Sequence, residues 1–374
     1  MRDHILVLNA GSSTLKASVL ARGSDTAEAS VTVPMHGLAD AASALTRALQ
    51  AVATNGIDPA TVRAVGHRVV HGGSIFTRTT KIDEAVVQSI RDLKSLAPLH
   101  NPVAAEVITA ARAALPGVPH AAAFDSAFHA TLPKAAYVYP LPYEWYSEWG
   151  YRRYGFHGLS VTWSIERATA LLGRDDLGVV VAHLGAGCSV SAVWRGRSVG
   201  ISMGMTPLEG LVMATRGGSV DPGVLLAAQR DHGLDVNQLE DALEHHSGLL
   251  GLSGRTGEMR ELLALAPADD RAALAIAVFE RSAAAAIAAA ATALSRLDAL
   301  VFTGGIGEHA ESVRRRIVLR LAASGVPSID ETRFESPEPA GDGDRVLVAG
   351  PVAVLVVVAR EDVVIAREVS TLIP

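Results

Sequence analysis

The sequence predicts an α/β protein made of two similar domains. Its 374 residues exceed the roughly 100–200 residues of one typical domain. Short apolar runs that suit buried strands alternate along the chain with Ala- and Leu-rich stretches at helical spacing. A strand–turn–strand pattern with small residues in its turn occurs once in each half of the chain. We therefore expect each half to form an α/β domain around its own hairpin.

The first hairpin lies within the first twenty residues. Residues 5–8 form an apolar run that predicts a buried strand. The turn that follows consists of small residues, Asn-Ala-Gly-Ser-Ser at 9–13, and a second strand is predicted over residues 15–20. The backbone N–H groups of the turn, the hydroxyl of Ser12 and the charge of Lys16 suit a phosphate group. An ordinary hairpin with a polar turn explains this stretch alone at least as well, because such turns are common.

The second hairpin repeats this pattern in the other half of the chain. An apolar strand over residues 178–182 leads into His-Leu-Gly-Ala-Gly-Cys-Ser at 183–189, and a strand over 190–194 follows. Placing Gly185 on Gly11 aligns the two hairpins without a gap. Two such hairpins could bind a polyphosphate from two sides, although the identity between them is low and the repeat alone is only a hint.

Composition excludes several classes of protein. The formal net charge of −6 argues against a nucleic-acid-binding protein, which usually carries a basic excess. The single cysteine, Cys188, can form no intramolecular disulfide or Cys-based zinc cluster, and it favours a reducing compartment. We expect no signal peptide, because the N-terminus leads straight into a strand. We expect no membrane span, because the most apolar helical run, residues 283–294, is short and mostly alanine. A cytoplasmic protein is predicted.

Two charged residues lie where predicted strands end. Arg68 lies within the apolar run 64–70, which a Gly-Gly turn follows. A buried charge is costly without a partner, so we favour a ligand-binding arginine over one that faces water from an edge strand. Asp125 follows a short apolar strand, at the position where α/β proteins commonly keep catalytic side chains. A helix N-cap is an equally good interpretation of Asp125.

Three glycine-containing loops carry further polar groups. One places two arginines and His157 between glycines. In another, Arg216-Gly-Gly precedes a predicted helix and could bind an anion with both charge and helix dipole. The third, Gly304 to Glu308, follows a buried strand, and its glycines let the backbone approach a ligand closely. The chain has no Walker A pattern, no protein-kinase signature and no third glycine after Gly185 and Gly187 to complete a dinucleotide fingerprint.

Ten short motifs in this order, from the first strand to the last helix, resemble the acetate kinase family. They are LNAGSSTLK, GHRVVHGG, APLHNP, FDSAFH, YGFHG, HLGAGCS, MGMTPLEG, TRGGSVDPG, FTGGIGE and REDVVIARE. The family belongs to the acetate and sugar kinase/Hsp70/actin superfamily. The resemblance therefore implies two actin/ribonuclease H-like domains around a nucleotide cleft, usually in a homodimer. Residues 1–148 would form the first domain, with the helix 361–374 packing back onto it, and residues 149–360 the nucleotide-binding domain.

Carried over position by position, the resemblance implies a set of site residues. Asn9 and Glu361 would hold Mg²⁺, with Mn²⁺ tolerated. The catalytic positions would be Arg68, Asp125, His157 and Arg216, and Arg68 would also bind the substrate carboxylate or the transferred phosphoryl group. The small apolar acyl pocket would consist of Val70, Leu99, Phe156 and Pro207. The ATP or ADP positions would be Ser12, Lys16, His183, Leu184, Gly185, Ala186, Gly187, Glu258, Met259, Arg260, Gly305, Ile306, Gly307, Glu308 and His309.

Four positions depart from the family pattern. The family's second hairpin usually reads HLGNGSS, whereas this chain has Ala186 and Cys188 in place of Asn and Ser. Glu258 replaces an Asp, and His309 replaces an Asn. These changes bear on nucleotide preference and affinity more than on the type of reaction.

The resemblance implies reversible, Mg²⁺-dependent transfer of the γ-phosphoryl group of ATP to acetate, giving acetyl phosphate and ADP. Acetate is already ionised at neutral pH, so the reaction needs fixed cations around a loose, in-line transition state rather than a strong base. Asp125 would orient a Mg²⁺-bound water or an arginine. Two alternatives stay open: a propionate or butyrate kinase, and a catalytically weak nucleotide-binding scaffold, for which Ala186 is the main argument. We expect neither nucleic acid nor membrane as a partner.

Overall fold

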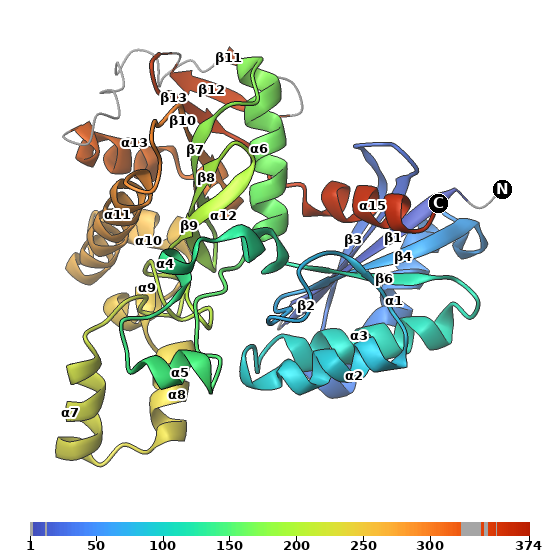
Figure 1. The fold of residues 1–374 in the computed structure, drawn as a ribbon, viewed down its shortest axis with the longest axis horizontal. Helices are drawn as coiled ribbons and strands as arrows, with labels where there is room; N and C mark the ends of the chain where they lie inside the picture. Colours follow the sequence, from blue (N-terminus) through green and yellow to red (C-terminus); the bar gives the residue numbers. More distant parts are fainter. Residues whose placement is uncertain (1–2, 12, 323–337, 340–342, 349) are drawn as a thin grey trace. The chain divides into compact units, whose positions relative to one another are not determined.

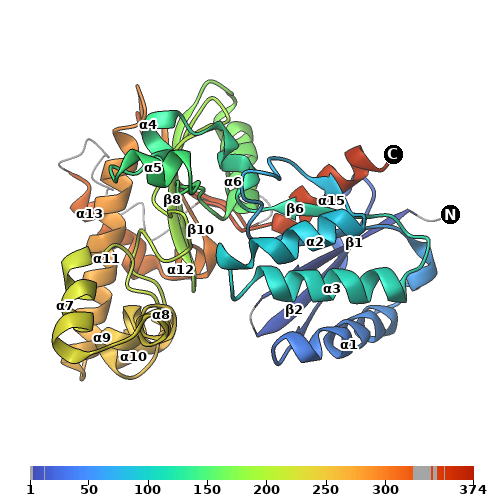
Figure 2. The same cartoon turned by 60° about the horizontal axis from the view of Figure 1, so that its bottom comes forward.

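The computed structural model describes residues 3–11, 13–322, 338–339, 343–348 and 350–374. The chain divides into two compact α/β units. Unit 1 comprises Met1–Ala130, Phe156–Trp163 and Arg360–Pro374, and unit 2 comprises Thr131–Gly155 and Ser164–Ala359. Residues 131–148, which the predicted boundary assigned to the first domain, therefore group with unit 2. Figures 1 and 2 show the elements from two directions.

Unit 1 is built on a six-stranded sheet with the order β3-β2-β1-β4-β6-β5. Strands β1, β4 and β6 are parallel, and β2, β3 and β5 are antiparallel to their neighbours. The elements are β1 (His4–Ala10), β2 (Thr14–Ala21), β3 (Ala27–Pro34), η1 (Leu38–Asp40), α1 (Ala41–Thr54), η2 (Pro59–Thr61), β4 (Val62–Val69), β5 (Thr80–Lys81), α2 (Glu84–Asp92), η3 (Leu93–Ser95), α3 (Asn101–Ala114), β6 (His120–Phe124), η4 (Ala127–Thr131) and α15 (Glu361–Leu372).

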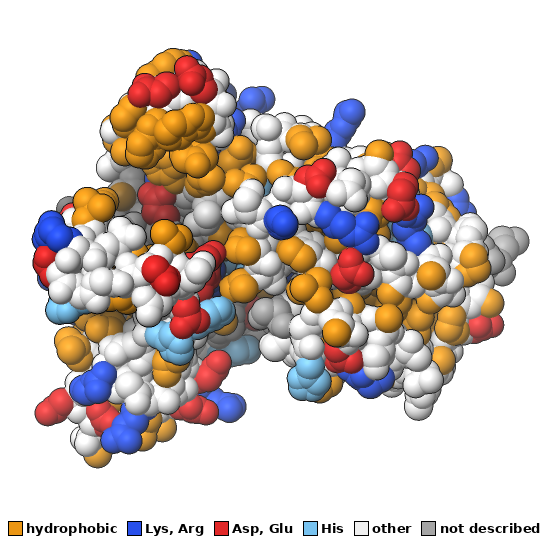
Figure 3. Space-filling view, turned by 90° about the horizontal axis from the view of Figure 1, so that it is seen from below, with side chains coloured by type: hydrophobic (Ala, Val, Ile, Leu, Met, Phe, Trp, Pro, Cys, Tyr) orange, Lys and Arg blue, Asp and Glu red, His pale blue; other side chains and the backbone are white. Residues whose placement is uncertain are grey.

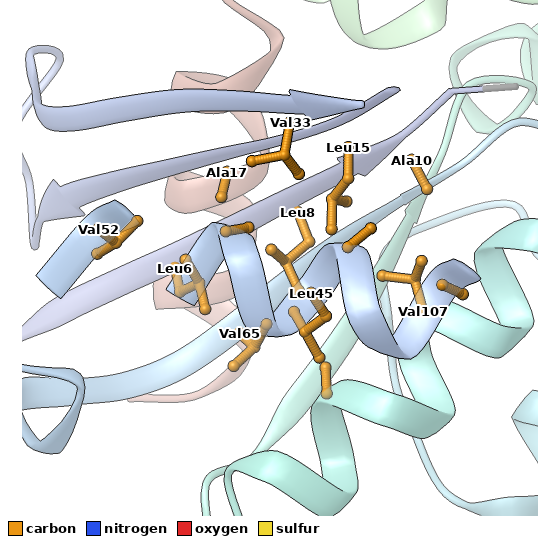
Figure 4. Packing of buried hydrophobic residues seen from close by; sticks show 14 of the residues in the cluster. Leu6, Leu8, Ala10, Leu15, Ala17, Val33, Leu45, Val52, Val65 and Val107 are labelled. Atoms are coloured by element: carbon orange, nitrogen blue, oxygen red, sulfur yellow. The ribbon is translucent and has the colours of Figure 1, made fainter. Parts of the chain in front are cut away.

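The core of unit 1 lies between one face of this sheet and helices α1 and α3. Leu6 and Leu8 of β1 and Leu15 of β2 point toward Leu45 of α1 and Val107 of α3 (Figure 4). Buried residues of α1 recur at the spacing of one helical face. The helices cover this face of the sheet because alternate strand side chains point toward it and each helix has a single apolar stripe to pack against them.

Helix α15 packs on the opposite face of the same sheet (Figure 1). A glycine in the middle of β4 makes the close approach possible, because a Cβ on Gly66 would lie 2.5 Å from Cγ2 of Ile365. Helix α15 thereby groups with unit 1. The packing carries Glu361, the first residue of α15, to the carboxyl ends of β1 and β4.

Unit 2 repeats the same topology on a seven-stranded sheet, with the order β11-β12-β13-β10-β7-β8-β9. Strands β7, β10 and β13 are parallel, like β1, β4 and β6. The elements are α4 (Lys134–Tyr137), α5 (Tyr143–Ser147), α6 (Gly158–Leu172, which starts in unit 1), β7 (Gly178–Leu184), β8 (Cys188–Trp194), β9 (Arg197–Ile201), α7 (Pro222–His232), α8 (Val236–His245), α9 (Gly248–Ser253), α10 (Met259–Leu265), α11 (Asp270–Ala291), β10 (Ala299–Thr303), α12 (Gly304–His309), α13 (Glu311–Arg320), β11 (Glu338–Pro339), β12 (Arg345–Val348) and β13 (Ala353–Val356).

The two predicted hairpins are equivalent, but the ungapped alignment between them is wrong by one residue. In the first, Ala10 pairs with Leu15, whereas in the second Leu184 pairs with Cys188. The second turn is therefore one residue shorter. Because side chains alternate across a strand, the slip decides which residues share a face. Lys16, opposite Asn9, corresponds to Ser189, opposite His183.

Among the described residues, α11 is the one helix long and apolar enough to cross a membrane. A buried core helix can meet the same criteria of length and composition. It packs against β7, β8, α9, α10 and α13, and Phe279 and Ile287 are fully buried. Its buried Glu280 forms an ion pair with Arg316 at 2.5 Å. These contacts leave α11 as an internal element of unit 2.

Candidate active site

The candidate acceptor site lies at the carboxyl ends of the three parallel strands of unit 1. Asn9 of β1 pairs in register with Arg68 of β4, and Arg68 pairs with Ala123 of β6. Asp125 follows β6 directly. Parallel strands end at one edge of the sheet, which is why residues separated by more than a hundred positions meet there. Glu361 reaches the same edge from the start of α15.

Arg68 is held by hydrogen bonds to two residues and by an ion pair with a third. Its Nε and a terminal nitrogen donate to the two oxygens of Asp125 at 3.0 and 2.5 Å, and the other terminal nitrogen donates to Oδ1 of Asn9 at 3.1 Å. Oε2 of Glu361 lies 3.5 Å from Nε of Arg68 and accepts a hydrogen bond from Nδ2 of Asn9 at 3.3 Å. This fork-to-fork geometry fixes both position and orientation of the guanidinium. Strand β4 lies inside the sheet, so the alternative of an edge-strand arginine facing water is wrong.

Burial and neighbouring charge oppose each other at Asp125. Only 1% of its surface is exposed. Burial raises the pKa of Asp125 to about 6, Arg68 opposes the rise, and the charge of Glu361 adds to it. Burial also lowers the pKa of Arg68, but the carboxylates of Asp125 and Glu361 raise it by more. Arg68 engages both carboxylate oxygens of Asp125, which favours a role in holding the guanidinium over the abstraction of a proton.

The oxygens of this cluster fit a hard divalent cation. Two carboxylates and one guanidinium leave one net negative charge, and Asn9 adds an amide oxygen. Mg²⁺ usually binds one or two carboxylates and keeps waters or substrate phosphates as its other ligands. In the part of the chain that the structure describes, no group of three His, Cys, Asp or Glu side chains could hold a metal by itself. The donor set therefore suits a metal that arrives with the nucleotide.

A strained segment beside Asp125 carries Phe156 and His157. His157 has a φ of 59°, which is rare for a residue other than glycine. Its backbone N–H donates to the carboxylate of Asp125, and the N–H of Gly158 donates to the backbone oxygen of Asp125 at 2.9 Å. Nε2 of the buried His129 lies 3.0 Å from the backbone oxygen of Phe156. The segment and the residues around Asp125 therefore hold each other in place.

Three of the four predicted acyl-pocket residues belong to unit 1. Val70 and Phe156 are buried, and Leu99 is half-buried. The ring of Phe156 packs edge-on against His71 at 5.2 Å between centroids. Pro207 belongs to unit 2, where its backbone oxygen accepts a hydrogen bond from Arg216 at 2.9 Å. Burial lowers the pKa of Arg216, and the charge of Glu244 opposes that effect.

Unit 2 contains a cavity of about 390 Å³ that brings together three predicted nucleotide segments. The hairpin turn, the start of α10 and the start of α12 all line it. No atom lies within 4 Å of a Cβ built on Gly305, so the backbone there is open to a ligand. Predicted residues that line the cavity are Gly185, Ala186, Glu258, Met259, Arg260, Gly305, Ile306 and His309.

Comparison with known proteins agrees with this arrangement. The sequence profile of the Acetokinase family matches residues 24–367. This chain belongs to the acetokinase family. An acetate kinase of Deinococcus radiodurans is 43% identical over 98% of both chains, and one of Clavibacter michiganensis is 40% identical over 97% of this chain and 98% of the relative.

Solved structures give the same result. An acetate kinase of Porphyromonas gingivalis superposes with a TM-score of 0.89 at 31% identity, over the full length of both chains. A propionate kinase of Francisella tularensis superposes with a TM-score of 0.87 at 33% identity, over 99% of each. The predicted family, the two-domain actin-like α/β fold and the carboxylate phosphotransferase reaction are therefore confirmed. The chain is an enzyme of this class, and the nucleotide is its phosphoryl donor or acceptor.

Some positions carried over from the acetokinase pattern are not among the residues that line the nucleotide cavity. His183, Leu184, Gly187, Gly307 and Glu308 do not line it. Glu308 is buried and accepts hydrogen bonds from the N–H groups of Gly304 and Ala359, both at 3.0 Å, so its carboxylate holds the β10–α12 turn. Lys16 is exposed on β2. Ser12 lies outside the described residues.

Two departures from the acetokinase pattern differ in their structural consequence. Sγ of Cys188 lies 3.2 Å from the backbone oxygen of Gly185, so the thiol closes the hairpin turn. Burial raises the pKa of Cys188 to about 12, and the thiol is neutral. Ala186 lines the cavity without a side-chain donor. Of these two departures, Ala186 is therefore the one that removes a side-chain donor from the nucleotide cavity.

Sequence reasoning missed the residues that position the site. Asn101 is fully buried and exchanges hydrogen bonds with the backbone of His71, at 3.1 and 2.9 Å. The hydroxyl of Ser126 accepts from the N–H of Gly72 at 2.9 Å. These contacts fix the end of β4 against α3 and the Asp125 loop. The motifs APLHNP and FDSAFH contain Asn101 and Ser126, so their polar residues within apolar surroundings were the available signal.

Proposed function

We propose that the chain transfers the γ-phosphoryl group of ATP to acetate, reversibly and with Mg²⁺, giving acetyl phosphate and ADP. The observation that carries the proposal is the guanidinium of Arg68, which Asp125 and Asn9 hold at the carboxyl ends of the unit 1 strands. A carboxylate acceptor needs a fixed cation to bind it, and a methyl group needs a dry surface. The names of the full-length relatives support acetate as that acceptor.

The acceptor side uses the unit 1 cluster. Arg68 binds the acetate carboxylate or the moving phosphoryl group, and Asp125 with Asn9 keeps the guanidinium aimed before substrate arrives. Such preorganised charge is usually the largest contribution to stabilising a transition state. Asp125 acts by orientation, because acetate carries no proton to remove. His157 and Arg216 supply further positive or donor groups to the transferring phosphoryl.

The donor side uses the unit 2 cavity. The backbone of the hairpin turn and of Gly305 approaches the phosphates, and the start of α10 with Ile306 lines the space for the rest of ATP or ADP. Asn9 and Glu361 would hold Mg²⁺, with Mn²⁺ as a substitute. The metal, when bound, neutralises phosphate charge and draws the phosphates into line for transfer. Ala186 suggests weaker phosphate contact than an Asn would give.

We also propose a cytoplasmic homodimer that needs neither nucleic acid nor membrane. The single cysteine supports a cytoplasmic location, and the net charge of −6 supports the absence of a nucleic-acid partner. A self-association surface is supported by unit 2, where α7 has no buried residue and both Val224 and Leu226 are about 60% exposed. Exposed apolar side chains of unit 2 also include Leu141, Tyr143 and Trp149, and Figure 3 shows hydrophobic side chains gathered on the lobe at the upper left of that view. Contiguous exposed apolar surface is typical of protein–protein contacts.

Trapping the acyl phosphate with hydroxylamine tests the proposed reaction. Acetate, ATP and Mg²⁺ should give acetyl hydroxamate, EDTA should abolish it, and added Mg²⁺ or Mn²⁺ should restore it. Arg68→Ala and Arg216→Ala should each lower kcat at least about 10²-fold, as loss of a preorganised stabilising group does. Arg22→Ala, at an exposed arginine of unit 1, is the matched control and should keep full activity. ATP binding without any acyl phosphate would instead indicate the nucleotide-binding scaffold.

A further inference from the structure

Unit 1 contains a second cavity, of about 520 Å³, that neither the acceptor cluster nor the nucleotide segments line. Its apolar wall comes from Phe124 and Phe128, from Leu159 at the start of α6, and from Leu372 at the end of α15. Ring stacking of Phe124 on Phe76, 4.6 Å between centroids, fixes that part of the wall. The volume lies in the range of small-molecule sites, which are mostly apolar with a few polar groups.

The polar groups at its rim differ in how they are engaged. Arg367 donates two hydrogen bonds to Asp25, at 3.0 and 2.6 Å, and its guanidinium lies 5.5 Å from the ring centre of Trp163. Glu368 accepts a hydrogen bond from the hydroxyl of Thr79. Arg78 is exposed and, among the described residues, forms no ion pair. The lining residues therefore carry two arginines and one carboxylate, and Arg78 is the arginine of the two that is not paired with Asp25.

We propose that this cavity binds a small amphipathic anion, with an apolar or aromatic body against Phe124, Phe128, Leu159 and Leu372 and an acidic head at Arg78. The apolar wall provides affinity by burial. The arginine provides orientation and a preference for carboxylate, sulfonate or phosphate heads, because its planar fork matches their oxygens.

Occupancy of the cavity is coupled to the acceptor site through two short segments. Phe128 lies three residues after Asp125, and Gly158 directly follows His157. A Cβ on Gly158 would lie 2.2 Å from the backbone oxygen of Asp125 and 2.7 Å from Cβ of Phe128. Packing this tight transmits displacement instead of absorbing it. A ligand against Phe128 therefore shifts Asp125 and the guanidinium that Asp125 holds.

A matched pair of fluorescent probes tests binding without any turnover, so its outcome is independent of the proposed reaction. The anionic probe is 8-anilinonaphthalene-1-sulfonate, and N-phenyl-1-naphthylamine has the same body without the sulfonate. We expect one equivalent of the sulfonate to bind and ATP to leave its Kd unchanged. Arg78→Gln should weaken the sulfonate about two- to fivefold, the range of one exposed charge pair, and leave the neutral probe unchanged. Arg22→Gln is the control and should change neither.

Two further variants and one reciprocal measurement complete the test. Ala127→Met fills the cavity and Leu372→Ala removes part of its wall at the end of α15, so each should weaken both probes. Acetate should change the Kd of the sulfonate probe by about fivefold, the low end of allosteric coupling, and the probe should change acetate affinity by the same factor. Displacement by ATP, or equal binding in Arg78→Gln, would overturn the site. A Kd that acetate does not move would overturn the coupling.

Discussion

Removing Arg68 should destabilise unit 1 far more than removing a surface arginine. The perturbation is a cycle of three variants: Arg68→Met, Asp125→Leu and the double variant, each with a side chain of similar volume. Arg68→Met leaves the carboxylate of Asp125, which is 1% exposed, without its ion-pair partner, and it also removes the ion pair of Glu361 with Arg68. Asp125→Leu leaves Arg68 with Glu361 at 3.5 Å. The arginine variant should therefore cost more than the aspartate variant.

The magnitude of the Arg68→Met effect has an upper bound from protonation. A stranded Asp125 can take up a proton instead of staying charged, and neutralising a carboxyl of pKa 3.8 at pH 7 costs about 4 kcal/mol at about 1.4 kcal/mol per pH unit. Breaking a buried pair costs about 3–5 kcal/mol, so we expect about 3–4. Because loss of Arg68 raises the folded-state pKa of Asp125 further above the unfolded value, the loss should be smaller at pH 6 than at pH 8. The double variant should lose less than the sum by about 1–3 kcal/mol.

Urea titration followed by hydrogen exchange of β4 and β6 measures these free energies within unit 1. The matched control is Arg91→Met, whose partner Glu106 is 42% exposed at the side chain. An exposed pair contributes about 1 kcal/mol or less. Additive single effects, or an Arg68→Met loss no larger than that of Arg91→Met, would refute the view that Arg68 is held by a buried, mutually dependent network.

Three other outcomes are expected. Val70→Ala should raise KM for acetate and improve kcat/KM for propionate or butyrate relative to acetate. In the wild type an added methylene overpacks the pocket, which costs about 1–3 kcal/mol, whereas in the variant its burial gains about 0.8 kcal/mol. Unchanged kcat/KM ratios across the three acids would show that Val70 does not line the acyl pocket. Burial lowers the pKa values of His120 and His129 to about 4, below the unfolded value of 6.5, so the unfolded chain binds more protons and stability should fall as pH drops from 6.5 toward 4. A urea midpoint that is the same at pH 7.5 and pH 5 would contradict this, and His129→Gln should flatten the dependence. Leu226→Glu should give monomers in sedimentation velocity where the wild type gives dimers, whereas Leu319→Glu on α13 serves as the exposed control; a wild-type monomer would rule out the dimer.

The sequence could predict which edge of the sheet carries the site but not how its residues contact one another. Strand patterns place Asn9, Arg68 and Asp125 at carboxyl ends, and parallel pairing brings such ends together. The contact of Glu361 with Asn9 depends on α15 returning to β4, which Gly66 permits and no local pattern reveals. The same limit explains the one-residue error between the hairpins, because turn length is set by pairing register. Histidine adopts a positive φ more often than most residues, but residue type alone does not place one at His157, and the sequence does not show that Asn101 and Ser126 are buried.

The return of α15 to unit 1 also constrains the order in which the protein can be made. Every strand of the first sheet leaves the ribosome before unit 2 begins, but the helix that covers the face around Gly66 follows all of unit 2. Domains generally fold as units during synthesis, so β1 and β4 must wait with one apolar face open while unit 2 is translated. Glu361 arrives with the same helix. The edge proposed to bind a cation is thus completed only after the second unit has been synthesised, and a chain stopped before α15 lacks both the helix that covers β1 and β4 and the carboxylate of Glu361.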